Sequence, residues 1–596
     1  MKYLVVLESP NKISKVKSYL EKVFPQHSFL VKASMGHITE LVIKNEKYPL
    51  GIELDTMTPI FNVVENKKDT IKQLISFANE VDKVILATDP DREGEAIAWH
   101  LQEQLKCQNK TIRLTFNEIT EKAIENAFNN PGQLDYQLVN AQQSRQMIDR
   151  IMGFKLSNLL QKAENLKSAG RVQSVALKLI VDTELERKEH NKLEYWTIKQ
   201  EYKDKNEIEL YLDQDGKEIV KDKVLNSQEK AEEVLSKITN NLVVKEIIET
   251  EFSKNIYDAY TTSSILQDAN IDLNYSSEKT TNLLQHLFEN GYITYPRTDS
   301  TRLNDDFVRA VHKFIATNYG QEYVGQYKSG KTKENVQDAH EAIRPTNINL
   351  TLDKAKKEIA NYDEYKLYEL IYINTLYALM ANETGVKYKV LFSNNGYTFK
   401  LNFKKYHFTS YYDLQEIVLD NFDYHFKVGE MITLESEWIA EQHFTKPSPR
   451  YTEHSLIKKL EIAGVGRPST YATIMRTLIN REYIKFDNKS IYPTEDGIKA
   501  HNLLQKYFSN IINEKYTADM EKVLDRIADG EINHIEFLKL FYNNFILDFN
   551  NATSIIFKNS VKCSKCDVGY IIQRKSYKGN YFKACSNFPA CKNIVS

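Results

Sequence analysis

The order of hydrophobic and polar positions divides the chain into regions of different character. In residues 1–152, short apolar runs alternate with amphipathic stretches: 3–7 and 84–87 predict buried strands, and the segment around 15–22 predicts a helix. Apolar strands separated by helices favour a parallel sheet that helices cover on both faces. We therefore predict an α/β domain over 1–152, with a small insertion near 36–81.

Two later regions have the alternating pattern of antiparallel strands. Residues 196–255 and 385–449 contain segments such as YWTIKQEY, YKVLF and YTFKLNF, rich in Tyr, Val, Ile and Phe. The region between them, 256–384, has helical spacing, as do 153–195 and 450–550. This order predicts a β-rich arm that holds an inserted helical domain, and a helical base domain assembled from 153–195 and 450–550.

Composition predicts a soluble protein of several domains. At 596 residues the chain is too long for one hydrophobic core. Hydrophobic residues make up 42% and charged residues 27%, and the mean hydropathy is −0.50. No apolar run approaches the roughly 20 residues that span a bilayer. The first apolar run ends at Glu8, so it is shorter than the hydrophobic region of a signal peptide. We expect a cytoplasmic protein with no membrane partner.

Residues 558–596 differ from the rest of the chain in charge and in cysteine content. The net charge of the whole chain is −2, yet this segment has eight Lys and Arg against one acid. Four of the five cysteines lie here, as Cys563-x2-Cys566-x18-Cys585-x5-Cys591. The spacing predicts a structural zinc site with four thiolates, with reduced, unliganded thiols as the alternative. Aromatic residues among the lysines favour binding to unpaired nucleic-acid bases.

Three carboxylates follow the second predicted strand. Asp89, Asp91 and Glu93 occupy alternate positions before a helix predicted to start near Gly94, so in an extended segment they would share one face. This is the carboxyl end of a parallel strand, where open α/β sheets bind ligands. Grouped carboxylates repel one another unless a cation lies among them, and Mg²⁺ prefers oxygen ligands. The alternative is a solvated acidic loop that begins a helix.

Glu8 and Lys12 directly follow the first predicted strand, so they are expected at the same edge of the sheet. A lysine there could bind phosphate or protonate a leaving oxygen. The segments LVVLESPNKISKV and ATDPDREGEAIAWHL resemble the Toprim domain of topoisomerases, primases and some nucleases. The resemblance implies that the magnesium ligands are Glu8, Asp89, Asp91 and Glu93.

The segment GYITYPRTDST, residues 291–301, resembles the active-site signature of type IA DNA topoisomerases. The resemblance implies that Tyr295 attacks a phosphodiester and takes the 5′-phosphate, leaving a free 3′-hydroxyl. The phosphotyrosine conserves the bond energy, so resealing needs no ATP. Because a tyrosine has an ordinary pKa of about 10, positive charge or a base must assist it. We expect Arg297 and Lys12 to contact the scissile phosphate, and Lys12 or Glu8 to transfer a proton to the leaving oxygen.

Further polar segments resemble the same family and suit a groove for the DNA backbone: SMGHITEL, QQSRQMIDRIMGF, SAGRVQSVAL, QDAHEAIRPT and GVGRPSTYATI. His340 and Arg344 would share a helix face if their segment were helical. Structural alternatives exist, because Thr470 could cap a helix and a histidine often only donates structural hydrogen bonds. The resemblance assigns DNA contacts to His37, Arg145, Arg150, Arg171, Gln173, Asp299, His340, Arg344, Arg467, Ser469 and Thr470.

These segments occur in the family's order over nearly the whole chain, and family members fold as a toroid. The toroid consists of a Toprim domain, a β-rich hinge arm, a helical domain bearing the tyrosine, and a helical base. The ending CSNFPACK resembles the zinc ribbons of bacterial topoisomerase I, with one ribbon here. The resemblance implies a monomer, associated with the bacterial nucleoid, that acts with magnesium on single-stranded regions of negatively supercoiled DNA and relaxes it.

Three other functions stay open at this point. The segment TYPRTD also resembles topoisomerase III, which would favour decatenation over relaxation. A Toprim nuclease or primase would use the carboxylates without Tyr295. A non-catalytic protein that binds single strands would need neither magnesium nor the acidic cluster.

Overall fold

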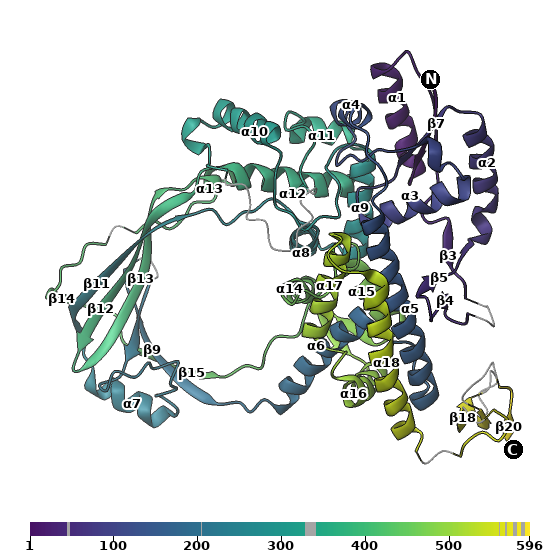
Figure 1. The fold of residues 1–596 in the computed structure, drawn as a ribbon. Helices are drawn as coiled ribbons and strands as arrows, with labels where there is room; N and C mark the ends of the chain where they lie inside the picture. Colours follow the sequence, from purple (N-terminus) through teal and green to yellow (C-terminus); the bar gives the residue numbers. More distant parts are fainter. Residues whose placement is uncertain are drawn as a thin grey trace.

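The computed structural model describes residues 1–43, 48–203, 206–327, 341–422, 424–558, 561–566, 569–575, 581–585 and 591–595. The elements form a ring, as the resemblance to the type IA family implies (Figure 1). An N-terminal α/β unit and a bundle of base helices make one side of the ring, a helical unit makes the top, and a β-sheet arm closes the opposite side. None of the described helices combines the length and apolar character needed to cross a bilayer.

A four-stranded parallel sheet, in the order β2-β1-β7-β8, forms the centre of the N-terminal unit. Its strands are apolar on both faces because α1 and α4 pack with Val5 and Leu7, whereas α2 and α3 pack with Leu4 and Val6. The predicted parallel sheet is therefore confirmed. The bounds are β1 (Lys2–Leu7), α1 (Ile13–Val23), β2 (Ser28–Ala33), α2 (Lys68–Asn79), β7 (Lys83–Ala87), α3 (Arg92–Leu105), β8 (Thr111–Arg113) and α4 (Glu121–Asn129).

The insertion predicted near 36–81 is narrower in the structure. Two antiparallel pairs lie outside the main sheet: β3 (Thr39–Leu41) with β6 (Phe61–Val63), and β4 (Ile52–Glu53) with β5 (Thr58–Pro59). Helix α2 belongs to the N-terminal unit itself, because its buried face packs into the core beneath the sheet. The insertion thus ends before α2.

The base is a helical bundle with one shared hydrophobic core, built from two separate parts of the chain. Helix α5 runs unbroken for 29 residues and crosses position 152, where the sequence predicts a domain boundary. One helix therefore joins the N-terminal unit to the base. The bounds are α5 (Tyr136–Glu164), α6 (Arg171–Glu189), α14 (Glu453–Ile462), α15 (Tyr471–Asn480), β16 (Ile484–Asp487), β17 (Ser490–Pro493), α16 (Glu495–Phe508), α17 (Glu514–Ala528) and α18 (His534–Ile556).

The arm is an antiparallel sheet of seven strands in the order β14-β11-β12-β13-β10-β9-β15, as the alternating pattern predicts. Its long strands β11 and β12 run to and from the inserted helical unit. The bounds are β9 (Glu194–Glu201), β10 (Glu207–Leu212), α7 (Gln228–Lys237), β11 (Asn241–Lys254), β12 (Glu383–Asn394), β13 (Tyr397–Phe408), α13 (Tyr411–Leu414), β14 (Met431–Thr433) and β15 (Ile439–Phe444).

The helical unit between β11 and β12 packs against the N-terminal unit, because residues of both belong to one hydrophobic core. Its helices are α8 (Thr262–Asp272), α9 (Ser277–Glu289), α10 (Asp305–Asn318), α11 (Leu352–Glu358) and α12 (Tyr362–Leu379).

The C-terminal ribbon follows α18 and has three short antiparallel strands, β18 (Ile571–Lys575), β19 (Tyr581–Cys585) and β20 (Ile594–Val595). Tyr570 of the ribbon stacks on Phe557 at the end of α18, with 5.4 Å between ring centroids. The ribbon is therefore in contact with the base.

Candidate active site and metal centre

Tyr295 lies on an extended segment after α9, where it is held between two parts of the fold. Its backbone N–H donates to Asn117 O of the N-terminal unit at 2.7 Å, and the N–H of Thr294 donates to Arg344 O at 3.0 Å. The turn after α9 requires Gly291, because φ is +68° and a Cβ would lie 2.5 Å from a backbone oxygen of the N-terminal unit. These bonds place the tyrosine at the junction of the helical and N-terminal units.

The phenol of Tyr295 meets the acidic segment directly. Its hydroxyl donates to Asp91 Oδ2 at 2.7 Å, and Arg297 Nη1 lies 3.4 Å from the same oxygen. Tyr295 is 2% exposed and packs edge-on against Phe288. Burial and then the charge of Asp91 raise the pKa of the phenol well above its ordinary value, although Arg297 opposes the shift. The phenol is therefore protonated and faces a carboxylate that can accept its proton.

Asp91 also begins helix α3. Its Oδ1 accepts a hydrogen bond from the N–H of Gly94 at 2.7 Å, which makes it the N-cap. Gly94 is required because a Cβ there would lie 2.1 Å from Asp89 O. Glu93 consequently belongs to the first turn of α3. The prediction that Asp89, Asp91 and Glu93 share the face of an extended segment is wrong, because the Asp91 side chain starts the helix two residues earlier.

Lys12 and Asp89 form an ion pair whose side chains are only 1% and 5% exposed. The Lys12 ammonium also lies 4.7 Å from the centroid of the Phe288 ring. Glu8 is close by: burial, followed by the charges of Asp89 and Asp91, raises its pKa to about 7. Negative charge is therefore crowded at this edge of the sheet, and a divalent cation would relieve the crowding.

Glu93 is held by two polar side chains. Its Oε2 lies 3.0 Å from His37 Nε2 and accepts a hydrogen bond from Gln142 Nε2 at 3.1 Å. Among the described residues, three or more ligand atoms of His, Cys, Asp or Glu lie within 4.8 Å of one another only at the four cysteines. The carboxylates predicted to bind magnesium supply suitable oxygen ligands, and three of them, Asp89, Asp91 and Glu93, also bond protein side chains.

Most of the predicted DNA contacts line two adjoining pockets beside the tyrosine. A pocket of about 80 Å³ is lined by residues that include Asp91, Glu93, Arg145, Arg297, Asp299, Arg467 and Ser469. A second one, of about 850 Å³, is lined by residues that include His37, Arg145, Arg150, Arg171, Gln173 and Thr470. Arg145, Glu93 and Gln142 line both, so the two pockets form one continuous polar surface. We call this surface the arginine groove.

Thr470 stands at the N-cap position of α15, but its side chain makes no capping hydrogen bond to that helix. Its hydroxyl bonds the backbone of Arg467, accepting from the N–H at 2.9 Å and donating to the carbonyl oxygen at 3.0 Å. These bonds fix the loop that brings Arg467 to the arginine groove.

Two arginines predicted to bind DNA are buried and paired with acids. The Arg171 side chain is 0% exposed, with Nε 3.1 Å from Asp149 Oδ1 and Nη2 2.7 Å from Glu521 Oε1. Arg344 is 4% exposed and pairs with Glu341 at 2.7 Å and Glu118 at 3.1 Å. Both guanidinium groups therefore already have carboxylate partners in the fold.

The helical spacing considered for His340 and Arg344 does not apply. The segment that contains Arg344 is not helical, since Arg344 O and the neighbouring backbone pair with the tyrosine segment. His340 lies outside the described residues.

Sequence reasoning missed several residues of the groove. Gln142 precedes Arg145 by three positions on α5, a spacing that could have placed both on one helix face. Arg92 and Asp525 line the smaller pocket and form an ion pair at 2.7 Å. Nothing in the local sequence around Asp525 signals this role, because its partners come from distant segments.

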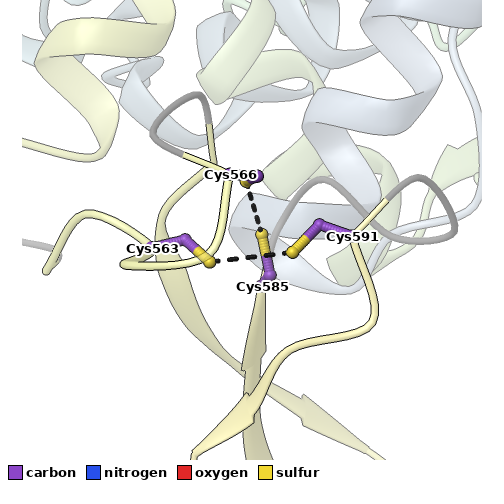
Figure 2. Close-up of side chains that lie close together, drawn as sticks. All are labelled: Cys563, Cys566, Cys585 and Cys591. Carbon is purple, nitrogen blue, oxygen red and sulfur yellow. Dashed lines mark hydrogen bonds between the residues drawn. The ribbon is translucent and has the colours of Figure 1, made fainter.

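The four cysteines of the ribbon converge on one point, with their sulfur atoms turned toward each other (Figure 2). Cys563 Sγ and Cys591 Sγ are 3.7 Å apart, and Cys566 Sγ and Cys585 Sγ are 3.5 Å apart. Zinc–sulfur bonds of about 2.3 Å in a tetrahedron separate the sulfurs by about 3.8 Å. No disulfide joins the described cysteines. The set therefore has the size and donor chemistry of a closed zinc site.

Comparison with known proteins agrees with the fold and the site. Residues 3–119 match the family model of the Toprim domain, and residues 133–539 match that of DNA topoisomerase. The chain therefore belongs to the DNA topoisomerase family, in the type IA class.

Its relatives include proteins named DNA topoisomerase 1. The one from Mycoplasmoides gallisepticum is 36% identical over 99% of this chain and 89% of its own length. The one from Campylobacter jejuni is 37% identical over 99% of this chain and 85% of its own length. The structure of full-length topoisomerase I from Thermotoga maritima superposes with a TM-score of 0.81 at 32% identity, covering 100% of this chain and 97% of that one.

Proposed function

We propose that this enzyme cuts one DNA strand with Tyr295, passes another strand through the gap and reseals the first, thereby relaxing negatively supercoiled DNA. One observation carries the proposal. The signature tyrosine and the acidic segment are 204 residues apart in the chain, yet the Tyr295 hydroxyl bonds Asp91 at 2.7 Å. A nucleophile, a proton acceptor and the cation Arg297 therefore meet at one point.

In the cleavage step the phenolic oxygen of Tyr295 attacks the phosphorus, and the bond from phosphorus to the 3′-oxygen breaks. The phenolic proton passes to Asp91, and the 3′-oxygen takes up a proton from Lys12 or Glu8. One end of the cut strand then carries a free 3′-hydroxyl, and the 5′-phosphate of the other end is bound to Tyr295. Resealing is the reverse reaction, and it needs no ATP because the phosphotyrosine keeps the bond energy.

Arg297 would stabilise the negative charge that develops on the phosphate oxygens. Glu8, Asp89, Asp91 and Glu93 would hold Mg²⁺, which supplies positive charge to neighbouring phosphate oxygens. Burial and then the negative charges of Asp89 and Asp91 raise the pKa of Glu8, and a bound cation would relieve the repulsion among these carboxylates.

We further propose that single-stranded DNA lies along the arginine groove. Its arginines would contact the phosphates, and aromatic side chains of the ribbon would stack on unpaired bases. The zinc held by Cys563, Cys566, Cys585 and Cys591 would have a structural role. We expect a cytoplasmic, nucleoid-associated monomer.

The test compares wild type with Tyr295→Phe on a negatively supercoiled plasmid, with and without Mg²⁺. We expect Tyr295→Phe to bind single-stranded DNA within about twofold of wild type and to relax no plasmid. Tyr292→Phe is the matched control, because it removes a hydroxyl three residues away on the same segment. Relaxation by Tyr295→Phe, or by wild type without any divalent metal, would refute the proposal.

A further inference from the structure

Helix α17 directs two carboxylates toward the arginine groove. Glu521 and Asp525 are four residues apart, so they lie on one helix face. Glu521 is 0% exposed, and its Oε1 lies 2.7 Å from Arg171 Nη2. The same oxygen lies 3.5 Å from Arg145 Nη2, and the second oxygen lies 3.8 Å from Arg467 Nε. One buried carboxylate thus pairs with three guanidinium groups.

Asp525 extends the network toward the tyrosine. Its Oδ2 lies 2.6 Å from Arg467 Nη2, and its Oδ1 lies 2.7 Å from Arg92 Nη2. Arg92 follows Asp91 directly in the chain, and both line the smaller pocket. The two carboxylates therefore connect arginines from α3, α5, α6 and the loop before α15.

The arginines of this network share their acidic partners. At ion-pair distance, Asp149 is the only other acid that pairs with these four arginines among the described residues. Asp299 adds negative charge near Arg467 at longer range. Asp149, Glu521 and Asp525 each pair with more than one arginine, so the guanidinium groups are held in place as a set.

The exposures of the side chains indicate which arginines can reach a ligand. Arg171 is 0% exposed, whereas Arg145 is 14% and Arg467 is 21% exposed. Burial alone would raise the pKa of Glu521, but the three neighbouring arginines outweigh burial and hold it at about 2. Glu521 is thus a permanent negative charge beneath the groove, and burial keeps it out of contact with DNA.

We infer that Glu521 and Asp525 are positioning residues, which orient Arg145 and Arg467 toward one phosphate of the bound strand. The inference rests on the proposed function, because it takes the arginine groove as the path of the cleaved strand. Neither carboxylate contacts the reacting atoms. Each acts through the arginines that it holds.

The test measures binding of a single-stranded oligonucleotide, without divalent metal, across a series of salt concentrations. Glu521→Gln keeps the shape of the side chain and removes its charge. We expect the affinity to fall about tenfold, and the slope of log affinity against log salt to decrease by about 0.7, the value of one phosphate contact on a single strand. Asp519→Asn, the same change of charge at an exposed position of α17, should alter neither quantity.

A second comparison separates positioning from a general effect on the fold. In a background with Arg145→Ala and Arg467→Ala, Glu521→Gln should change the affinity less than twofold, because the residues through which it acts are gone. If Glu521→Gln does not fold, Asp525→Asn takes its place, with Arg467→Ala as the background. A folded variant with wild-type affinity and slope would overturn the inference, and so would an effect of full size in the arginine-deficient background.

The same wild-type preparation is assayed for a covalent DNA adduct. If wild type forms no adduct, the proposed function fails, whereas a normal adduct with unchanged salt slopes in the variants overturns only the role of Glu521 and Asp525.

Discussion

Replacing Asp91 by Asn separates its structural role from its chemical one. Asp91 caps α3 through Oδ1 and accepts the Tyr295 hydroxyl through Oδ2 at 2.7 Å. Asn can accept the same capping bond, and the two residues are about equal as N-caps. We therefore expect the capping contribution to change by less than about 1 kcal/mol. What Asn removes is the negative charge next to the phenol and Arg297.

A hydrogen bond to a charged group contributes about 1.5–3 kcal/mol. Each 1.4 kcal/mol is a factor of ten in rate, so strand cleavage by Asp91→Asn should slow by about 10- to 100-fold. Loss of a magnesium ligand would slow it further, and raising the Mg²⁺ concentration should restore part of the activity. The assay is time-resolved formation of the covalent adduct on a labelled oligonucleotide, with Glu125→Gln, an exposed acid on α4, as control. Wild-type cleavage by a correctly folded Asp91→Asn would refute the reasoning.

The remaining predictions concern buried ions and the ribbon. Arg171→Met removes one partner of a fully buried ion pair, so it should lower the free energy of unfolding, measured by chemical denaturation, by about 3–5 kcal/mol. The control Arg150→Met should change the free energy of unfolding little. Equal effects of the two variants would contradict the structural role of Arg171. Because the pKa of Glu521 is lowered from 4.5 to about 2 in the folded state, its stabilisation, on the order of 3 kcal/mol, is present above pH 4.5 and is lost as the pH falls toward 2. The difference in unfolding free energy between wild type and Glu521→Gln should shrink over that range, and a constant difference would exclude this origin. A chelator should release one zinc ion per chain and make the four thiols of the ribbon reactive, without shifting the main unfolding transition. If the four thiols already react before chelation, the zinc site is contradicted.

The sequence predicted the elements whose burial shows in the local pattern. The strands around Val5 and Ile85 are apolar on both faces, so the parallel sheet could be predicted, and the alternation near Phe399 likewise predicted the antiparallel arm. The limits of the units were less predictable, because α5 continues through position 152 with no change in its helical pattern.

The chemistry of the site depended on resemblance more than on pattern. Tyr295 is one of 36 tyrosines, and no spacing distinguishes it from those in the core. The ion pairs of Arg171 with Glu521 and of Arg344 with Glu118 could not be predicted, because these partners are hundreds of positions apart in the chain. Only the folded chain shows that these two arginines are buried and already have carboxylate partners.

The central claim is that the Tyr295 hydroxyl is the nucleophile. The direct test of this claim is mass spectrometry. The cleaved complex is trapped with a single-stranded oligonucleotide and Mg²⁺, the protein is digested, and the peptides are analysed. We predict a 5′-phosphonucleotide on the peptide that contains Tyr295, with fragment ions that place it on this residue. A covalent nucleotide on any other residue, or the same adduct in Tyr295→Phe, would contradict the account.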